Sequence, residues 1–599
     1  MVTKFEVLPN EILIQCFEYL NAPYLFYSFD RLNYRFNDLI RRIPLCINLR
    51  ENLAKSIFDK FCIKMLLNPK IKDQVYSLNL PLSEDNDPAG RLRTKQFLSF
   101  FSLDDFSNLQ NFQTDGDVNF SSVNTVSFDF DDKHRRKFSM VSFSKLRALS
   151  ISVLNRDSTY SENISLSITN LTLRKYEFDD FYWLSKHAPM LEYLHLCRVR
   201  SFGRLMTKQT NESFPFLKKL IIDDFTYGSF NDFETLVKLT PYLKNLTISG
   251  GNNDLIDAPR WEQLITRSLP SLNTFQFMFS CGCNETTRDI MIYKLEEFQS
   301  DFWRKEHHWF TEYAIADDSI CVYTIPYVSN KYELKSNYER HPQDLKNKSD
   351  TFINVTNLRL SCEILKKKCE DYFSNVKYLQ LDGDSKSLPM KEIECLRKII
   401  NPFHLKHLDL PWIRHINSSL VLKLLEQMPQ LSVLSIWRDD LINYLYNNSE
   451  LCKCLNKMVK RLYVKGYGVD DLFRMDQFYE IFCNIEHLRF ENIRGEELLF
   501  SLNRLPKLST LQAKWVIEGY PDRFITRIKK KFKRQNVIYE INAEESYIDE
   551  GYGCHECRGS YRDSDFSCSN VECVYSHYSK PRMKKYDFKI SMWRDKCMN

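Results

Sequence analysis

The chain has 599 residues, more than one hydrophobic core normally organises, so several domains or one elongated array are expected. A hydrophobic content of 43% and an aromatic content of 14% exclude a disordered polymer, and a net charge of only +5 gives no reason to expect nucleic-acid binding. Only 15 glycines are present, which argues against glycine-rich phosphate loops, and no apolar run reaches the ~20 residues of a membrane span.

The first forty residues contain three short apolar sets at helical spacing. After Leu8-Pro9, the sets fall within residues 12–20, 24–32 and 36–40, and the break at 21–23 ends the first helix. Three short helices cannot bury this much apolar surface among themselves, because so small a unit has too little interior. The surplus predicts a partner for this segment.

An apolar-x-x-apolar-x-apolar pattern then recurs along most of the chain. Its first positions are 21 to 29 residues apart on either side of one long gap, which is the range of leucine-rich repeats. A degenerate first copy stands at Val75/Leu78/Leu80. The other copies begin at Val123, Leu146, Ile168, Leu191, Leu217, Leu243, Leu272, Val355, Val376, Leu405, Leu431, Val459, Ile485 and Leu508.

Two leucines spaced by two point to the same side of a short strand, and segments such as 232–239 and 496–502 have helical character. One repeat cannot cover its own apolar face, but stacked neighbours do. We therefore predict an α/β fold in which residues 70–541 form a curved solenoid, with strands on the concave face and helices outside.

The interval near residues 280–350 breaks the pattern. It contains a helical run from 291 to 309, one plausible strand at 320–325 and a charged stretch from 330 to 350 that we expect to be a surface loop. Either degenerate repeats or a long helix-bearing insertion fits this interval.

With both parts in place, residues 5–49 resemble an F-box, and the whole chain resembles an F-box protein with leucine-rich repeats. The resemblance is carried by Leu8-Pro9, Glu11-Ile12-Leu13, Phe17, Tyr19-Leu20, Tyr24-Leu25, Phe29 and Phe36-x-x-Leu39. The sequence departs from the family at Phe36, where Trp is common, and at Ala22-Pro23, where an Asp often leads the second helix.

The resemblance implies a non-catalytic substrate receptor of a Skp1-cullin-F-box ubiquitin ligase, in which the box docks Skp1 and the repeats bind a protein substrate. The residues it assigns to Skp1 are Leu8, Pro9, Glu11, Ile12, Leu13, Phe17, Leu20, Leu25, Phe36 and Leu39. The alternative is a leucine-rich-repeat scaffold outside any ligase, whose N-terminal helices only cap the solenoid.

Residues that alternate with the buried leucines should face the concave surface and contact the substrate. They are Tyr193, His195, Tyr378, His407, Asp409, Trp437, Arg461, Tyr463, His487 and Arg489. Arg461, Lys465 and Arg489 would suit an anionic substrate segment.

The last segment, 542–599, has a different composition. Cys554, Cys557, Cys568 and Cys573 (or His577 in place of the last) could hold zinc, while the alternative is a flexible tail with free thiols. The basic run 529–534 is either a nuclear-import or nucleic-acid patch or, as we expect, the solvated face of the last repeat helix.

No nucleophile motif, paired carboxylates or phosphate loop marks an enzyme, and apart from this zinc no cofactor is expected. Without a signal peptide or membrane span, the chain is expected in the cytoplasm, the nucleus or both, its 18 cysteines mostly thiols.

Overall fold

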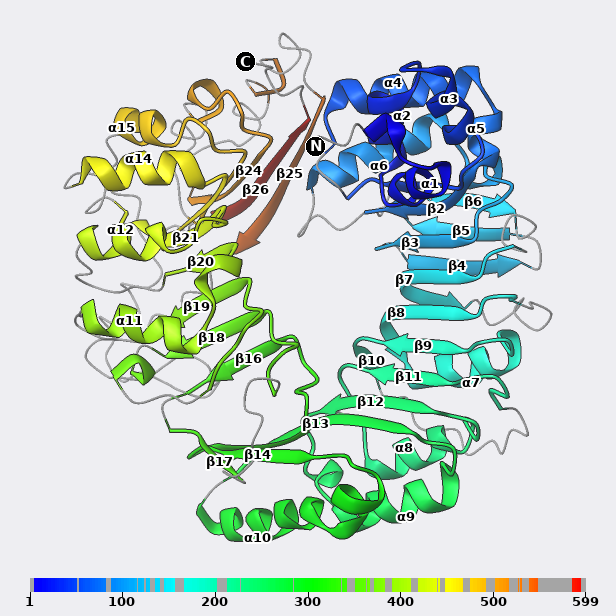
Figure 1. The fold of residues 1–599 in the computed structure, drawn as a ribbon, viewed down its shortest axis with the longest axis vertical. Helices are drawn as coiled ribbons and strands as arrows, with labels where there is room; N and C mark the ends of the chain where they lie inside the picture. Colours follow the sequence, from blue (N-terminus) through cyan, green and yellow to red (C-terminus); the bar gives the residue numbers. More distant parts are fainter. Residues whose placement is uncertain are drawn as a thin grey trace, which may run out of the picture. The chain divides into compact units, whose positions relative to one another are not determined.

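A computed structural model shows the fold of the chain (Figure 1). It describes residues 5–50, 53–81, 88–115, 117–122, 125–129, 135–139, 145–156, 166–201, 213–226, 228–283, 285–335, 337–341, 351–361, 363–366, 371–382, 390–410, 418–438, 440–441, 448–466, 475–491, 501–516, 526, 528–530, 538–547 and 584–593. The chain divides into two compact units: unit 1 comprises 1–376 with 394–401, and unit 2 comprises 377–393 with 402–599.

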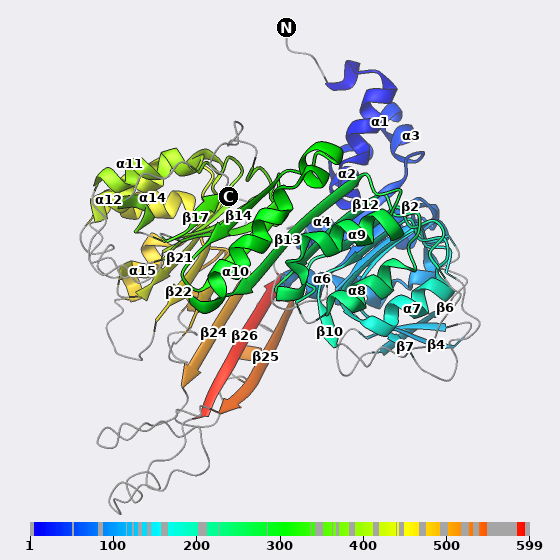
Figure 2. The ribbon, with the colours of Figure 1, turned by 90° about the horizontal axis from the view of Figure 1, so that it is seen from below.

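Unit 1 begins with a helical segment. Its elements are the 3-10 turn η1 (Phe5–Val7) and the helices α1 (Asn10–Glu18), α2 (Ala22–Phe29) and α3 (Tyr34–Ile40). Pro23 lies in the first turn of α2, where a missing N–H costs nothing, and the Asn33 side chain accepts a hydrogen bond from Phe36 N at the start of α3. Figure 2 shows α1 and α3 projecting from the sheet of unit 1. The three helices expected between residues 12 and 40 are therefore present.

This helical segment is joined directly to the first strand of the sheet, β1 (Leu45–Asn48). The Asn21 side chain donates to Asn48 O at 2.7 Å and accepts from Asn48 N at 3.0 Å, and α4 (Lys55–Leu67) packs against α2. β1 pairs in parallel with β2 (Val75–Leu80), so the sheet begins within the segment 5–49 that was predicted as the box and before residue 70. The helices α5 (Lys70–Asp73) and α6 (Pro88–Phe100) and the turn η2 (Leu103–Asp105) complete this part.

The main body of unit 1 is a ladder of parallel strands. They are β3 (Asn111–Thr114), β7 (Ala148–Arg156), β8 (Asn170–Glu177), β9 (Tyr193–Leu196), β11 (Lys219–Ile222), β12 (Asn245–Gly250) and β13 (Thr274–Gly282), with the short β10 (Val199–Ser201) beside β8. Neighbouring strands keep the repeat in register, so that Leu194, Leu220 and Leu246 are opposite one another, all fully buried. This register confirms a parallel α/β repeat fold.

Helices follow the strands of this ladder as the pattern predicts. They are α7 (Phe178–His187), α8 (Phe230–Val237) and α9 (Ala258–Ser268), the last preceded by η5 (Asn253–Leu255). Ser229 and Asp232 form a capping box that starts α8, and the buried Trp261 of α9 stacks against Phe279 of β13. Figures 1 and 2 show α8 and α9 on the same side of the sheet, so neither helix covers the opposite face, which we call the open face.

One predicted repeat strand is not part of the ladder. The second and third positions of the triplet that begins at Val123 are Val126 and Phe128, in β5 (Thr125–Asp129), while Val123 itself lies outside the described residues. β5 pairs antiparallel with β4 (Asp117–Ser122) and β6 (Arg135–Ser139). The ladder instead passes from β2 through β3 to β7, because Leu109 and Phe112 supply the buried positions there. The prediction of a repeat strand at this triplet is therefore wrong, because an antiparallel strand with apolar residues two apart satisfies the same pattern.

The irregular interval is a helix-bearing insertion. After β13 come α10 (Glu285–Glu296), η6 (Glu297–Gln299), the π-helical turn η7 (Phe302–Glu306), and the strands β14 (Thr311–Ile315) and β15 (Ser319–Thr324). The expected strand at 320–325 is β15, but it pairs antiparallel with both β13 and β14 and so ends the parallel ladder. The prediction of a loop at 330–350 is wrong at two places, where the chain forms strands. β16 (Lys331–Leu334) pairs in parallel with β18 (Asn357–Ser361), and β17 (Glu339–His341) pairs with β14.

Unit 2 repeats the parallel ladder. Its strands are β19 (Tyr378–Asp382), β20 (His407–Asp409), β21 (Val433–Trp437), β22 (Arg461–Lys465), β23 (His487–Phe490) and β24 (Thr510–Val516). Its helices are α12 (Ser418–Glu426), α14 (Ser449–Met458) and α15 (Met475–Ile481), and it also contains the turn η9 (Pro402–His404). The helix α11 (Met390–Ile399) spans the boundary between the two units, and the turn η8 (Ile364–Lys366) belongs to unit 1. Every apolar triplet predicted from Val376 onward therefore coincides with a strand.

The end of unit 2 differs from the prediction. β25 (Ile538–Tyr547) and β26 (Lys584–Trp593) are antiparallel, and β26 lies between β24 and β25 in the sheet. The tail predicted from 542 onward therefore contains part of one strand and the whole of another. Among the described residues, none of the helices combines the length and the apolar character needed to cross a bilayer.

Candidate functional site

The residues assigned to Skp1 separate into an interior and an exterior group. Leu13, Phe17, Leu25, Phe36 and Leu39 are interior residues, each at most 5% exposed. They hold the three helices together, as the 5.9 Å separation of the Phe17 and Phe36 rings illustrates. Leu8 is half-buried, and the exposed members are Pro9, Glu11, Ile12 and Leu20. Only these exterior residues offer surface to a partner.

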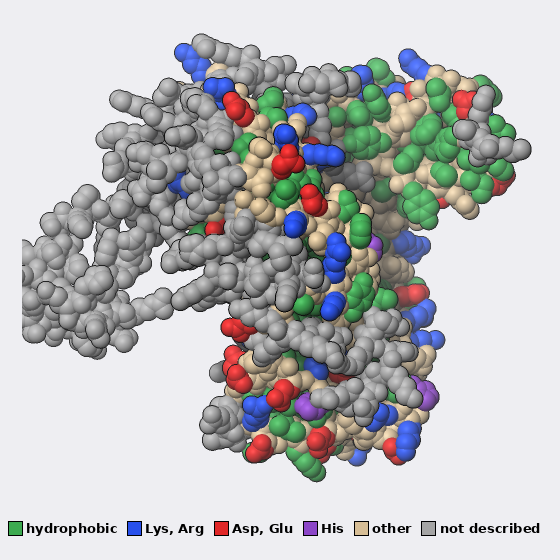
Figure 3. All heavy atoms as spheres, turned by 60° about the vertical axis from the view of Figure 1, so that its left-hand side comes forward, with side chains coloured by type: hydrophobic (Ala, Val, Ile, Leu, Met, Phe, Trp, Pro, Cys, Tyr) green, Lys and Arg blue, Asp and Glu red, His purple; other side chains and the backbone are tan. Residues whose placement is uncertain are grey.

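A cluster of exposed apolar side chains surrounds these exterior residues, and we call it the helical patch. Figure 3 shows hydrophobic side chains gathered over this N-terminal lobe at the upper right. Tyr19 and Tyr34 are 90% and 87% exposed. The patch consists of Phe5, Val7, Ile12, Tyr19, Leu20, Tyr27, Leu32 and Tyr34. So many large apolar side chains on one small segment are typical of an interaction surface.

Arg35 fixes the chain entering α1, a role the sequence did not reveal. Its guanidinium donates to Asn10 Oδ1 at 2.7 Å, to Glu6 O at 2.6 Å and to Leu8 O at 2.5 Å. Because a guanidinium presents its donors in a rigid planar fork, these bonds orient the Leu8-Pro9 turn relative to α3. The helical patch is thereby held in one arrangement.

The open face of the unit 1 ladder begins with uncharged polar side chains. The first outward row runs from Cys46 through Ser77, Asn111 and Ala148 to Asn170, and the second from Asn48 through Asn79, Gln113 and Ser150 to Thr172. With Tyr193 these residues line a hollow of about 420 Å³. The repeat pattern does not predict this hollow, because β1 and β3 lack the full apolar triplet.

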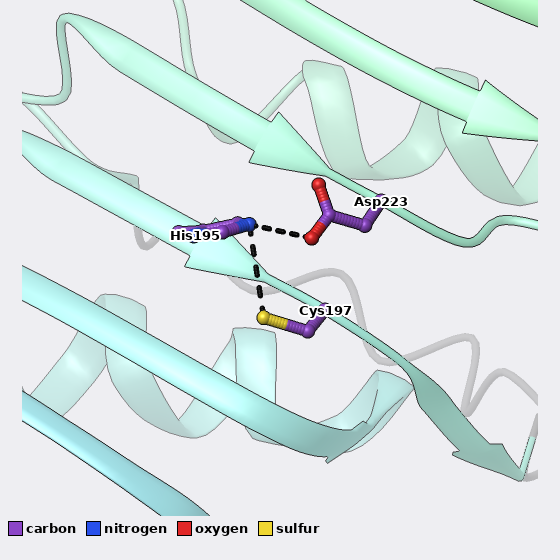
Figure 4. A group of neighbouring side chains, drawn as sticks. All are labelled: His195, Cys197 and Asp223. Carbon is purple, nitrogen blue, oxygen red and sulfur yellow. Dashed lines mark hydrogen bonds and ion pairs between the residues drawn. The ribbon is translucent and has the colours of Figure 1, made fainter. Parts of the chain in front are cut away.

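The chemistry of this face changes at β9 and β11. Tyr193 and His195 continue the two outward rows, and Lys219 Nζ lies 5.6 Å from the centre of the Tyr193 ring. The register places His195 opposite Ile221 and brings Asp223, just after β11, beside it. Cys197, two residues after His195, projects from the same end of β9, as Figure 4 shows.

His195, Cys197 and Asp223 form a compact polar trio. His195 Nε2 is 2.8 Å from Asp223 Oδ2 and 3.7 Å from Cys197 Sγ. Burial lowers the pKa of His195, but its hydrogen bonds with Asp223 and Cys197 outweigh burial and raise this pKa to about 9. The side chains of His195 and Asp223 are 24% and 51% exposed. Of these three residues, the sequence pattern predicts only His195 on the concave face.

The open face of unit 2 gathers most of the other nominated residues. One outward row joins Tyr378 to His407 and, beyond Val433, to Arg461 and His487. A second row joins Gln380, Asp409, Ser435, Tyr463 and Arg489, while Trp437 is opposite Lys465. Tyr193 and His195 belong to the face of unit 1 instead.

Asp409 is the centre of a hydrogen-bond network in unit 2. Its side chain is 8% exposed, and its carboxylate accepts from Lys465 Nζ at 2.8 and 2.9 Å and from Tyr378 Oη at 3.1 Å. This network ties β19, β20 and β22 together. The charge of the half-buried Lys465 is therefore paired with Asp409, and of the three predicted anion-binding residues Arg461 and Arg489 are exposed.

His407 lies beside this network. Its Nε2 is 2.9 Å from Ser435 Oγ, and its ring is perpendicular to that of Tyr378 with centres 4.4 Å apart. Burial lowers the pKa of His407 to about 4, Lys465 and Arg461 act in the same direction, and Asp409 opposes them. His407 is therefore a neutral ring at physiological pH.

The predicted tail site and basic run are only partly covered by the structure. Cys554, Cys557, Cys568 and Cys573 lie outside the described residues, as do residues 531–534. Ile528 is fully buried while Lys529 and Lys530 are exposed, which is the arrangement expected for the solvated face of a repeat helix.

Comparisons with known proteins leave the family open. No family model matches the sequence. No curated protein matches it either. Among solved structures, a Bacteroides fragilis protein is 13% identical over 48% of this chain and 73% of that one, with a TM-score of 0.22. TLR13 in complex with single-stranded RNA is 16% identical over 75% of this chain and 67% of that one, with a TM-score of 0.25. Scores this low define no shared fold, so the fold assignment rests on the strand register of the chain itself.

Proposed function

We propose that this chain is the substrate-recognition subunit of a Skp1-cullin-F-box ubiquitin ligase. The observation that carries the proposal is the helical patch, a cluster of exposed apolar side chains on three short helices built onto a long parallel repeat sheet. In this proposal the patch docks Skp1, and Skp1 links the chain to a cullin. The open faces of the repeat ladders bind a protein substrate.

The chain would perform no bond-making step itself. Its contribution would be proximity, since holding a substrate lysine near a ubiquitin-loaded enzyme replaces a bimolecular encounter with an effectively unimolecular one. Such a role needs a firm connection between docking segment and ladder. The paired hydrogen bonds between Asn21 and Asn48 provide that connection within unit 1.

The substrate surface is proposed on the open face of unit 2. Tyr463 and Trp437 are half-buried there, and Arg461 and Arg489 are exposed. Aromatic and arginine side chains supply most of the binding energy of protein interfaces. The two arginines favour a substrate segment that carries negative charge.

Co-expression of the full chain with Skp1, followed by gel filtration, tests the docking step. The informative variant is Ile12→Asp with Leu20→Asp, because both side chains are exposed (42% and 37%) and their loss leaves the helical interior intact. The matched control is Ile290→Asp with Tyr293→Asp, two exposed apolar residues of α10 (62% and 68%).

The proposal expects a 1:1 complex with Skp1 for the unmodified chain and for the control variant. It expects at least a tenfold loss of affinity for the patch variant, because two charges would be buried against an apolar partner. The assignment to a ligase is contradicted if no complex forms, or if the patch variant binds Skp1 as tightly as the unmodified chain does.

A second candidate is a repeat scaffold whose helical segment only caps the sheet. It is favoured by the packing of α2 against both β1 and α4, which is what a cap would do. A scaffold would bind its target in the patch variant as well as in the unmodified chain, and would not copurify with Skp1.

Substrate recognition has its own test. Affinity capture with cullin neddylation inhibited should retain ubiquitination targets on the chain, and Arg461→Glu with Arg489→Glu should lose them while Skp1 binding persists. If this variant captures the targets as well as the unmodified chain does, the substrate does not bind at the open face of unit 2.

A further inference from the structure

The trio on the open face of unit 1 has the composition and spacing of a metal site. Its donors are an imidazole nitrogen, a thiol sulfur and a carboxylate oxygen, and these atoms all lie within 4.8 Å of one another. Three such groups converge because the β9–β11 register places Asp223 beside the end of β9, where Asp223 N donates to Leu196 O at 2.9 Å. His195 lies on β9, and Cys197 and Asp223 directly follow the ends of β9 and β11, where backbone hydrogen bonds to Leu173 O and Leu196 O fix their positions.

We propose that His195 Nε2, Cys197 Sγ and Asp223 Oδ2 bind a Zn²⁺ ion, with the fourth coordination position open to an exogenous ligand. A tetrahedral zinc with bonds of ~2.0–2.3 Å separates its ligand atoms by roughly 3.3–3.6 Å. The observed separations from Nε2, 2.8 Å to Oδ2 and 3.7 Å to Sγ, approach these values within about half an ångström. The third separation, between Asp223 Oδ2 and Cys197 Sγ, is at most 4.8 Å, so binding the ion requires side-chain rotations that adjust these three separations.

The donor set selects the metal. Mixed nitrogen, sulfur and oxygen ligation suits zinc, whereas calcium and magnesium require oxygen ligands. A thiolate and a carboxylate together neutralise the two positive charges of the ion. Cys197 takes part in no disulfide, so its sulfur is available for this purpose.

The surroundings leave one side of the trio accessible. Asp223 is exposed, and His195 and Cys197 are half-buried on a face that α8 and α9 do not cover. Three protein ligands and one open position are the arrangement in which zinc binds water or an incoming group. A partner's His, Cys or carboxylate side chain is the chemical class that would complete the site. This inference is independent of the proposed ligase role.

The competing interpretation is a metal-free ion pair between His195 and Asp223. Titration of the full chain with Co²⁺ separates the two, because cobalt bound to a thiolate in tetrahedral geometry gives charge-transfer and d–d absorption bands that an ion pair cannot give. The titration is made in a background in which Cys554, Cys557, Cys568 and Cys573 are all replaced by Ser, so that these tail thiols cannot supply the signal. Added Zn²⁺ should then displace the cobalt.

The expected result is one equivalent of tetrahedral Co²⁺, displaced by one equivalent of Zn²⁺. Cys197→Ser should abolish the thiolate band, and Asp223→Asn should weaken binding at least tenfold. Asp224→Asn and Cys283→Ser are the matched controls, because Asp224 bonds to Thr226 instead and Cys283 is half-buried elsewhere in unit 1. Both should bind as the background chain does.

Two results overturn the proposal. One is the absence of thiolate–cobalt bands when the tail cysteines are replaced. This result also covers the case in which the unmodified chain shows the bands, because the metal is then bound by the tail alone. The other is binding that Cys197→Ser leaves unchanged. Circular dichroism confirms that each variant folds, and the exposed Asp223→Asn substitution gives an independent measure if Cys197→Ser fails to fold.

Discussion

The ladders of the two units are alike on the inside and different on the outside. The inward side chains Leu220 and Leu246 in unit 1 and Leu462 in unit 2 are all fully buried. Outward, the early strands of unit 1 carry amides and hydroxyls, whereas β19 to β23 of unit 2 carry histidines, arginines, tyrosines and the Asp409 network. The comparison teaches that the inward rows specify the repeat fold, and that the outward rows are where the two units acquire different binding properties.

The inward rows should be energetically equivalent in both units. Leu246→Ala in unit 1 and Leu462→Ala in unit 2 should each lower the unfolding free energy by about 3 kcal/mol, because each leaves a cavity in a close-packed interior. Native-state hydrogen exchange of the neighbouring strand amides measures the loss separately in each unit. If the loss of unfolding free energy is several-fold smaller in one unit, the two interiors are not energetically equivalent.

The Asp409 network should give unit 2 an outward row that contributes to stability. Lys465→Met should cost about 2 kcal/mol, because it leaves the nearly buried Asp409 carboxylate without its cation. The matched exposed pair in unit 1 is Lys218–Glu192, 51% and 48% exposed, where Lys218→Met should cost at most about 0.5 kcal/mol. Denaturant titrations of both variants test this, and equal costs would contradict it.

Acid should weaken unit 2 through His407. Because folding lowers the pKa of His407 from 6.5 to about 4, the unfolded chain binds a proton more readily between these values, and stability falls as the pH drops through this window. After allowance for solvent screening, the loss is on the order of 1 kcal/mol. His407→Asn should remove this part of the pH dependence in thermal unfolding, and an unchanged profile would exclude His407 as its source.

The smallest effect is expected in the uncharged rows of unit 1. Ser150→Ala should change the unfolding free energy by no more than about 0.5 kcal/mol, since Ser150 is half-buried on the open face and pairs in register with Gln113 and Thr172. A denaturant titration against the unmodified chain measures it. A loss above 1 kcal/mol would mean that this row, like that of unit 2, holds the sheet together.

The apolar triplet pattern predicts a strand wherever a repeat keeps its leucines. Strand prediction fails where a polar residue replaces one of the leucines or where a strand pairs antiparallel outside the ladder. β3 was missed because its last inward residue is Thr114, and β26 because its alternation of Tyr586, Phe588 and Ile590 has a period of two without the repeat spacing. The triplet that begins at Val123 satisfies the pattern, but its second and third positions, Val126 and Phe128, lie in an antiparallel strand, β5. Local pattern does not reveal which strand a segment will pair with.

For the candidate sites as well, the local pattern predicts some residues, and strand pairing brings in others that it does not predict. Alternation along one strand was enough to place His195, Tyr463 and Arg461 on the open faces. Asp223 is 28 residues from His195 in the sequence, and only the register of β9 with β11 brings the two together. One repeat length added to His195 leads to Ile221, two residues short of Asp223, so the repeat spacing alone does not point to this neighbour. In the helical segment, helical spacing identified the apolar residues but not which of them face inward.

The position of β26 has a consequence for the order in which the chain folds. This strand comes from residues 584–593, yet it lies inside the sheet, between β24 and β25. During synthesis β24 therefore has an unpaired edge until the ribosome has released residue 593, and exposed strand edges are templates for aggregation. A messenger truncated before residue 584 would yield a chain with that edge permanently open, a natural target for chaperones and protein quality control.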